Sequence, residues 1–139
     1  MRLGTLISLA LWAAASGVRA EDPAQIEAAL ATQARAENPA FAGFSAERGE
    51  RFFNATHGGD WSCATCHGSD PRATGKHTVT GKPIEPLAPA ANAKRFTNPA
   101  KVEKWFRRNC NDVLQRTCTA SERGDVLAFL RSLPAPGVR

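Results

Sequence analysis

Methionine is almost missing from this chain, because Met1 is its only copy. Beyond the first residue, no thioether side chain is therefore available to bind a metal. Apolar runs are also scarce: the longest, residues 6–15 (LISLALWAAA), is too short to span a bilayer comfortably. The sequence has no internal repeat, and its four cysteines fall into two pairs with no odd thiol. What remains points to one small domain that uses cysteine for specific chemistry.

The first twenty residues have the pattern of a secretory signal peptide. Arg2 supplies a positive start, the apolar run follows, and 18–20 (VRA) is a small-x-small cleavage site. A retained membrane anchor is the alternative. We expect cleavage after Ala20, export to the periplasm, and no membrane insertion of the mature chain. The expected domains are the signal peptide, 1–20, and one domain, 21–139, made of an N-terminal extension (21–44), a core (45–133) and a tail (134–139).

Cys63, Cys66 and His67 form the pattern Cys-x-x-Cys-His within 62–70 (SCATCHGSD). This pattern is typical of c-type haem attachment, in which two thiols add to the haem vinyl groups and the histidine binds the iron from one face. A zinc site would need further ligands at short spacing, and a redox disulfide would need a βαβ pattern around it. Since the sequence offers neither, we expect one covalent haem c with iron.

Helical patterns dominate the rest of the chain, and no strand pattern is convincing. The predicted helices cover 23–37, 45–53 with Ser45 as N-cap, a segment starting at Asn98 and Pro99, and 121–133 with Ser121 as N-cap. A glycine inside the second helix, Gly49, is explained by close approach of another helix, with a tolerated surface glycine as the alternative. The irregular stretch 68–93 is expected to wrap a haem. The predicted fold class is all-α.

An amide interrupts the apolar face of the helix that starts at Pro99. Val102, Trp105, Phe106 and Asn109 follow at i, i+3, i+4 and i+7. Burying an asparagine without partners costs about 1–3 kcal/mol. Asn109 must therefore be hydrogen-bonded, exposed at a helix end, or bound to a metal. On periodicity alone, a helix cap at Asn109 is the simplest interpretation.

Cys110 and Cys118 are the second cysteine pair. Along one continuous helix their Cα atoms would be about 12 Å apart, whereas a disulfide needs about 4.4–6.8 Å. Either the two are not bonded, or the helix ends just past Asn109 and the chain turns back. The second interpretation is favoured, because unpaired thiols of an exported protein would be exposed to oxidation.

Several residues compete for the second axial position of the iron. His57 lies in a glycine-rich loop before the haem motif, and His77 lies in the irregular stretch after it. Either would give a closed bis-histidine iron and a plain electron-transfer protein. A lysine from 94–104, a water molecule and Asn109 are further candidate ligands, and an open position is also compatible with the sequence.

Basic residues gather between 94 and 108, where six lysines and arginines accompany a single acid, Glu103. Such a cluster is often a solvated helix face, and it also suits the docking of an acidic redox protein. Nucleic acid is not an expected partner of an exported haem protein.

Segments of the core identify a known family by resemblance. They are 46–49 (AERG), 63–68 (CATCHG), 86–89 (PLAP), 95–97 (RFT), 102–105 (VEKW), 108–111 (RNCN) and 118–119 (CT). Over 45–133 the sequence resembles the sphaeroides haem protein (SHP) type of monohaem cytochrome c. The haem motif is common to all cytochromes c, so the specificity of this resemblance rests on Trp105 to Cys118.

The resemblance implies a class I cytochrome c fold and a disulfide between Cys110 and Cys118. It also implies that Asn109 binds the oxidised iron and leaves on reduction, which opens a position for oxygen, nitric oxide or carbon monoxide. Trp105, Arg107 and Arg108 are nearby in the sequence and are the candidates to hold the departed amide or to hydrogen-bond a bound gas. An amide oxygen is a hard, weak donor that suits ferric better than ferrous iron. The family's context implies a multihaem c-type cytochrome as electron donor, docking on 94–108. Oxygen reduction, nitric oxide dioxygenation or no catalysis at all are equally compatible with the sequence.

Overall fold

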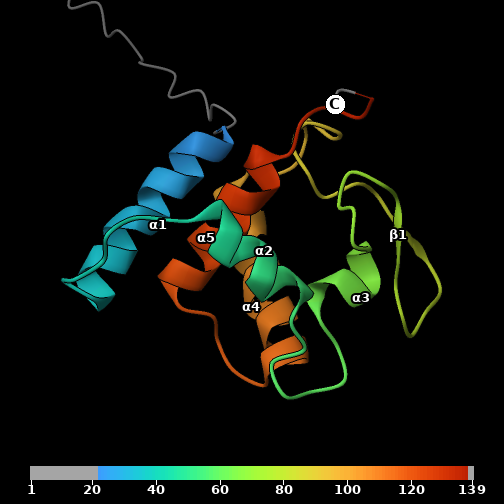
Figure 1. Ribbon diagram of the computed structural model, residues 1–139, viewed down its shortest axis with the longest axis horizontal. Coiled ribbons are helices and arrows are strands. Elements are labelled where there is room, and N and C mark those ends of the chain that lie inside the picture. The colour runs from blue at the N-terminus through green and yellow to red at the C-terminus, as the bar shows by residue number, and fades with distance from the viewer. Residues whose placement is uncertain (1–21, 138–139) are drawn as a thin grey trace, which may run out of the picture.

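The computed structural model describes residues 22–137, so the expected signal peptide and the end of the tail lie outside the described part. Helices dominate, joined by loops and one short hairpin (Figure 1). The elements are α1 (Pro23–Glu37), α2 (Ala46–Asn54), α3 (Cys63–His67), β1 (Gly75–Lys76), β2 (Pro83–Ile84), α4 (Pro99–Leu114) and α5 (Ala120–Ser132). The all-α class is confirmed. No helix within 22–137 has the length and apolar character needed to cross a bilayer.

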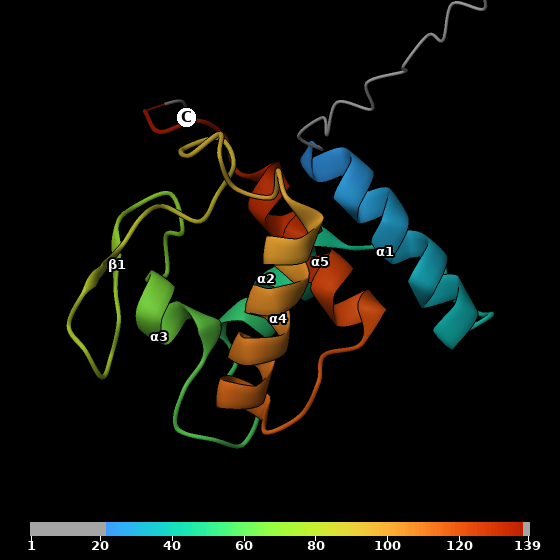
Figure 2. The same ribbon diagram turned by 180° about the vertical axis from the view of Figure 1, so that it is seen from behind.

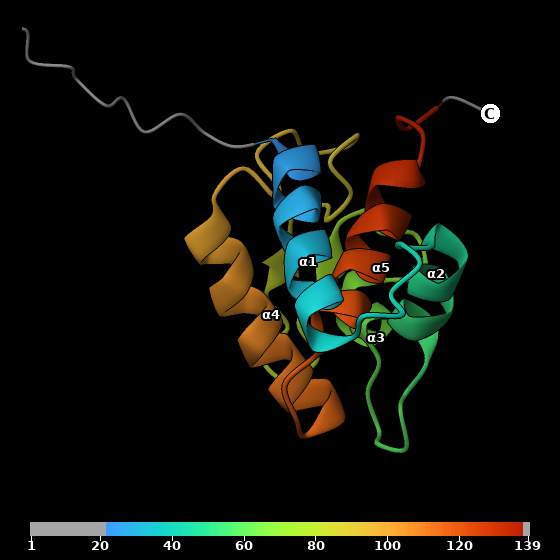
Figure 3. The ribbon, with the colours of Figure 1, turned by 90° about the vertical axis from the view of Figure 1, so that its left-hand side faces the viewer.

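Helix α5 is the centre of the core, with α1 and α2 packed on it (Figure 3). One cluster joins Leu127 of α5 to Ile26 and Leu30 of α1. A second cluster joins Phe129 and other residues of α5 to Phe53 of α2. Each apolar group withdrawn from water contributes to stability in proportion to its area, so α5 anchors both helices.

The first two helices form where the sequence predicts them. Helix α1 spans Pro23–Glu37 and begins with a capping box at Asp22. Helix α2 has Ser45 as its N-cap, whose hydroxyl accepts from the backbone N–H of Arg48 at 3.2 Å. The Arg48 side chain turns away from the cap and binds Asp125 of α5, with Nε 2.7 Å from Oδ2. This ion pair fixes the start of α2 on α5.

Two predicted helix boundaries are wrong. Helix α4 does not end just past Asn109 but continues to Leu114, and the chain reverses at Gln115, whose φ of 57° is left-handed. The reversal still brings Cys110 and Cys118 together, because it needs only to precede Cys118. Helix α5 is capped by Thr119 rather than Ser121, through a capping box with Glu122.

The long segment between α3 and α4 loops around one side of the molecule (Figure 2). It contains a short antiparallel pair, in which Gly75 of β1 lies opposite Ile84 of β2. The sequence analysis predicted irregular backbone here and no strand. Two residues per strand are too few to give an alternating pattern, so periodicity has nothing to detect.

Candidate haem-binding site

Helix α3 carries the haem motif and is only five residues long. Ser62 caps it through a capping box with Thr65, and Gly68 ends it with a φ of 76°. Within this turn, Cys63 and Cys66 are free thiols, and His67 follows directly. The short, doubly capped helix therefore presents two thiols and an imidazole from one rigid piece of backbone.

Burial favours the uncharged forms of Cys63 and His67. Burial raises the pKa of the Cys63 thiol to about 11. Burial, and then the positive charge of Arg95, lowers the pKa of His67 to about 4. At neutral pH His67 is thus an uncharged imidazole, the form that binds metals. The donor set of two thiols and one neutral imidazole fits a c-type haem.

An apolar wall faces this donor set. The ring centroid of Phe53 in α2 lies 6.3 Å from that of His67. Around Phe53 the core cluster draws side chains from three other helices and one loop: Cys63, Ala64, Leu87, Phe106, Phe129 and Leu130. A haem is a large apolar ring, so side chains of this kind are what its faces require. Because Phe106 belongs to α4 and Cys63 to α3, the cluster also sets these two helices on either side of one apolar region.

The β1 strand lies directly against the haem motif. A Cβ atom at Gly75 would lie 2.3 Å from the carbonyl oxygen of Cys66 and 2.9 Å from Cα of His67, so a side chain there would clash. In the turn that follows β1, Thr78 Oγ1 lies 3.1 Å from Sγ of Cys66. The stretch 68–93 is predicted from the sequence to wrap the haem, but Gly75 and Thr78 are not among the predicted site residues. A glycine in an unpatterned stretch was the available signal for close backbone approach.

Arg95 is also absent from the predicted site residues, because in the sequence it is part of the basic segment 94–108. Its guanidinium turns inward, where Nε donates to the carbonyl of Pro86 at 2.9 Å and Nη2 donates to that of Glu85 at 2.7 Å. Its charge acts on His67, whose pKa it lowers. Arg95 therefore acts on the site through its charge, while its side chain stays partly exposed.

Helix α4 presents Trp105 and Asn109 one turn apart. Asn109 lies in mid-helix, five residues before Leu114, so the interpretation that it caps the helix is wrong. Phe106, three residues before it, packs into the cluster that contains Cys63. Trp105 is 48% exposed, with Lys104 Nζ 5.9 Å and Arg108 Cζ 5.6 Å from its ring centroid. By their i, i+3, i+4 spacing, Trp105, Arg108 and Asn109 share one face of α4, with Lys104 next to Trp105.

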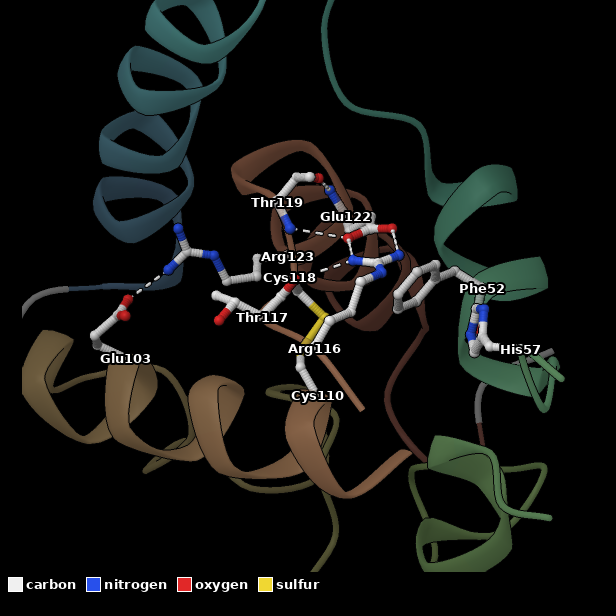
Figure 4. Close-up of a disulfide and its surroundings, with 10 residues drawn as sticks. All are labelled: Phe52, His57, Glu103, Cys110, Arg116, Thr117, Cys118, Thr119, Glu122 and Arg123. Atoms are coloured by element: carbon white, nitrogen blue, oxygen red, sulfur yellow. Dashed lines mark hydrogen bonds and ion pairs between the residues drawn. A yellow bond between two sulfur atoms is a disulfide. The ribbon is translucent and has the colours of Figure 1, made fainter. Parts of the chain in front are cut away.

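Both loop histidines contact backbone groups of residues close to them in the sequence. His57 packs against Phe52 with its ring tilted by 50° and the ring centroids 4.3 Å apart, and its Nε2 lies 2.9 Å from the Phe52 carbonyl oxygen (Figure 4). His77 sits in the hairpin, where its Nδ1 accepts from the backbone N–H groups of Val79 at 3.2 Å and Thr80 at 3.3 Å. Either histidine would have to give up these interactions to reach an iron.

Cys110 and Cys118 are bonded in the structure, with Cα atoms 5.7 Å apart (Figure 4). The disulfide joins α4 to the residue just before the cap of α5. Beside it, Arg116 Nη2 lies 2.5 Å from Oε1 of Glu122, and the Thr119 N–H donates to Oε2 of Glu122 at 2.8 Å. The chain reversal at Gln115 is thereby fixed by one covalent bond and one ion pair.

Comparison with known proteins places this arrangement in a family. A model described as "Domain of unknown function (DUF1924)" matches residues 39–130. The chain is 48% identical to the cytochrome c-type protein SHP of Cereibacter sphaeroides over 112 residues, which cover 78% of this chain and 81% of SHP. It is 41% identical to cytochrome c'' of Methylophilus methylotrophus over 107 residues, or 74% of each chain.

Solved structures agree with these sequence matches. The structure of oxidised SHP, described as an oxygen-binding cytochrome c, superposes with a TM-score of 0.71 at 45% identity and covers 80% of this chain and 96% of its own. Oxidised cytochrome c'' gives a TM-score of 0.71 at 38% identity, covering 79% and 93%. The chain therefore belongs to the family of c-type cytochromes that includes SHP and cytochrome c'', and its cofactor is a covalently bound c-type haem.

Proposed function

We propose that this chain is an exported, periplasmic monohaem cytochrome c that accepts an electron and then binds a diatomic gas on the side of the haem covered by α4. The relative SHP is described as oxygen-binding, which supports gas binding here. The observation that carries the proposal is the position of Asn109. It is a mid-helix amide, it comes one residue before a disulfide cysteine, and it comes three residues after Phe106, which packs into the apolar cluster beside the haem motif.

Each residue of the haem site has a separate role. In this proposal Cys63 and Cys66 attach the haem and His67 binds its iron, while the unit 21–139 acts as one domain after removal of 1–20. When bound, the haem would supply a redox-active iron. Asn109 would be the second side chain to hold that iron in the oxidised protein, and its neutral amide oxygen would be a poor donor to ferrous iron. Reduction therefore favours its departure.

The residues beside Asn109 supply the hydrogen-bond donors available to the amide after it leaves the iron and to the bound gas. The indole N–H of Trp105 is an uncharged donor one turn away, and Arg108 lies over the same ring at 5.6 Å. His57 and His77 contact nearby backbone groups, which supports Asn109 rather than either histidine as the second ligand of the iron.

Replacing Asn109 by alanine tests this assignment. The Asn109→Ala variant is expected to change the absorption spectrum of the oxidised protein to that of a high-spin haem. Asn111→Ala, an exposed asparagine on the same helix, is the matched control and should leave the spectrum unchanged. If Asn109→Ala leaves the spectrum unchanged and His57→Ala or His77→Ala alters it, the protein is a closed-site electron carrier.

We also propose that the electron donor docks on the exposed basic face of α4. Lys101, Lys104, Arg107 and Arg108 are exposed there, and this face suits an acidic partner, of which a multihaem c-type cytochrome is the expected class. Electrostatic steering makes association fall with ionic strength. Raising the salt concentration should therefore slow reduction, and Lys104→Glu should slow it more than Lys82→Glu in the hairpin. A rate independent of salt would contradict this docking mode.

A further inference from the structure

Arg95 differs from the other arginines that the fold shields from solvent. Within residues 22–137 these shielded arginines are Arg72, Arg95 and Arg123. Arg72 pairs with Asp70, and Arg123 pairs with Glu103. Arg95 forms no ion pair with any carboxylate of the same described residues. A charge withdrawn from water costs free energy unless a counter-charge or hydrogen bonds compensate for it. Arg95 is therefore a half-buried cation whose charge this part of the chain does not neutralise.

Two main-chain carbonyls hold the Arg95 guanidinium in place. Its Nε donates to the carbonyl of Pro86 at 2.9 Å, and its Nη2 donates to that of Glu85 at 2.7 Å. These bonds orient the guanidinium but bring no negative charge to it. The carboxylate of Glu85 accepts instead from the side-chain amide of Asn92, at 3.2 Å. The fold therefore positions Arg95 and leaves its charge uncompensated.

The loop that holds Arg95 is fixed to the segment of the haem motif. Two successive backbone N–H groups, beginning with that of Leu87, donate to the carbonyl of Pro71 at 2.8 and 3.0 Å. Pro71 is buried and comes four residues after His67. The side chain of Leu87 also packs into the apolar cluster beside the haem motif. Arg95 is thus tied, through this loop, to the backbone that carries the histidine.

The backbone on the other side of Arg95 is held in an uncommon conformation. Phe96 has a φ of 56°, in the left-handed region that a bulky side chain rarely adopts. Its ring packs against both core clusters, the one around Phe53 and the one around Leu127. Such a conformation persists only where the surrounding structure determines it. The position of Arg95 is therefore set from both sides.

We propose that Arg95 sets the electron affinity of the haem iron, because its uncompensated positive charge beside the haem motif favours ferrous over ferric iron. Ferrous iron carries one positive charge less, so a nearby cation repels it less. After burial, the charge of Arg95 is the second cause that lowers the pKa of His67, so its field reaches this imidazole. A haem also carries two carboxylates, and an arginine that neutralised one of them would act in the same direction. The inference rests on the proposed binding of iron by His67 and is independent of Asn109.

The test separates the charge of Arg95 from its hydrogen bonds. In the haem-loaded protein, Arg95→Gln removes the charge but keeps a side chain that donates hydrogen bonds, whereas Arg95→Lys keeps the charge. Lys94→Gln removes the same charge from the exposed neighbour and is the matched control. For each variant we would measure the reduction potential at low and at high ionic strength, together with the absorption spectrum of the oxidised protein.

The expected pattern follows the charge at position 95. Arg95→Gln should shift the ferric–ferrous equilibrium roughly tenfold toward ferric iron, which lowers the reduction potential by about 59 mV. The difference from the parent should shrink at high salt, because salt screens a charge that is partly exposed. Arg95→Lys should keep most of the parental potential, and Lys94→Gln should change it much less than Arg95→Gln does. All three oxidised spectra should match that of the parent, since no proposed iron ligand is altered.

Three results would overturn the inference. An unchanged potential in Arg95→Gln would show that its charge does not reach the iron. Equal shifts in Arg95→Gln and Arg95→Lys would show that the arginine only holds the loop at 85–86. An equal shift in Lys94→Gln would show an effect of net charge alone.

The His67→Ala variant tests the proposed function separately. It is expected to change the absorption spectrum of the haem-loaded protein. If it does so while the potential of Arg95→Gln stays at the parental value, the inference fails and the proposed function stands. If the spectrum of His67→Ala matches that of the parent, iron binding by His67 is refuted and the inference fails with it.

Discussion

Gly49 of α2 lies directly against the main-chain carbonyl of Asp125 in α5. A Cβ atom at Gly49 would be 1.9 Å from that oxygen and 3.0 Å from Cβ of Phe129. The two helices therefore meet backbone to backbone at this point. The ion pair between Arg48 and Asp125, which adjoins this contact, fixes the same crossing. The packing of α2 on α5 places Phe53 beside His67, so this contact supports the haem side of the fold.

Gly49→Ala should destabilise the protein, although alanine is the better helix former. Alanine gains about 1 kcal/mol in helix propensity, but the clash with backbone forces the helices apart, and we expect a net loss of about 2 kcal/mol. Urea unfolding followed by circular dichroism measures it. Glu50→Ala, the exposed neighbour, serves as control. A Gly49→Ala variant as stable as the parent would refute the close contact.

Loss of the disulfide should cost stability and loosen Asn109 together. In the chain-entropy model, a loop of this length contributes about 2.5 kcal/mol. The double variant Cys110→Ser, Cys118→Ser should therefore unfold at lower urea, and added imidazole should bind its oxidised form more tightly. If stability falls while imidazole binding stays as in the parent, the disulfide does not position Asn109.

Glu122 should make stability depend on acid pH. Burial alone would raise the pKa of Glu122, but hydrogen bonds from Arg116 and Thr119 outweigh it and bring the pKa below its ordinary value of 4.5. The folded protein thus holds the charged form more firmly than the unfolded chain does. The resulting stability is present above pH 4.5 and is lost as the pH falls through the lower folded value.

Glu122→Gln keeps the capping pattern at Thr119 but removes the charge. We expect it to lower the free energy of unfolding at pH 7 by about 1 kcal/mol, with the difference shrinking in acid. Unfolding curves at several pH values measure this, with Glu47→Gln, in an exposed pair, as control. A difference that is constant with pH would rule out the charge as its source.

Gly75→Ala should impair haem attachment. Any side chain at this position would overlap the Cys66 carbonyl, so the hairpin must move away from α3 and take Thr78 with it. The ratio of haem absorbance to protein in purified material reports attachment, and Thr74→Ala is a neighbouring control. Full haem content in Gly75→Ala would show that the hairpin does not need this contact.

Local sequence signals predicted those parts of the fold that depend on neighbouring residues. Ser45 was recognised as a cap, and Gly49 was explained by close helix approach, because caps and interior glycines have strong local causes. The haem motif is also local, and α3 presents its three side chains from a single helix. The partner of Gly49, by contrast, lies far along the chain in α5, and no local pattern names it.

The errors arose where a residue acted against its usual preference or through distant contacts. The end of α4 was set too early because Gln115, not glycine or asparagine, takes the left-handed position. The start of α5 lies at Thr119 rather than at the predicted cap Ser121, because Glu122 completes a capping box with Thr119. Arg123 looks like one more surface charge in the sequence, and only the tertiary structure brings it to Glu103 and Gln33.

The most direct test of the account is the absorption spectrum of the pure protein when oxidised, when reduced, and when reduced under carbon monoxide. The central claim is that the haem side covered by α4 opens on reduction. It predicts a high-spin reduced spectrum that shifts sharply with carbon monoxide. Sharp low-spin bands that do not respond to carbon monoxide would contradict it and would show that a strong ligand, such as His57 or His77, stays bound.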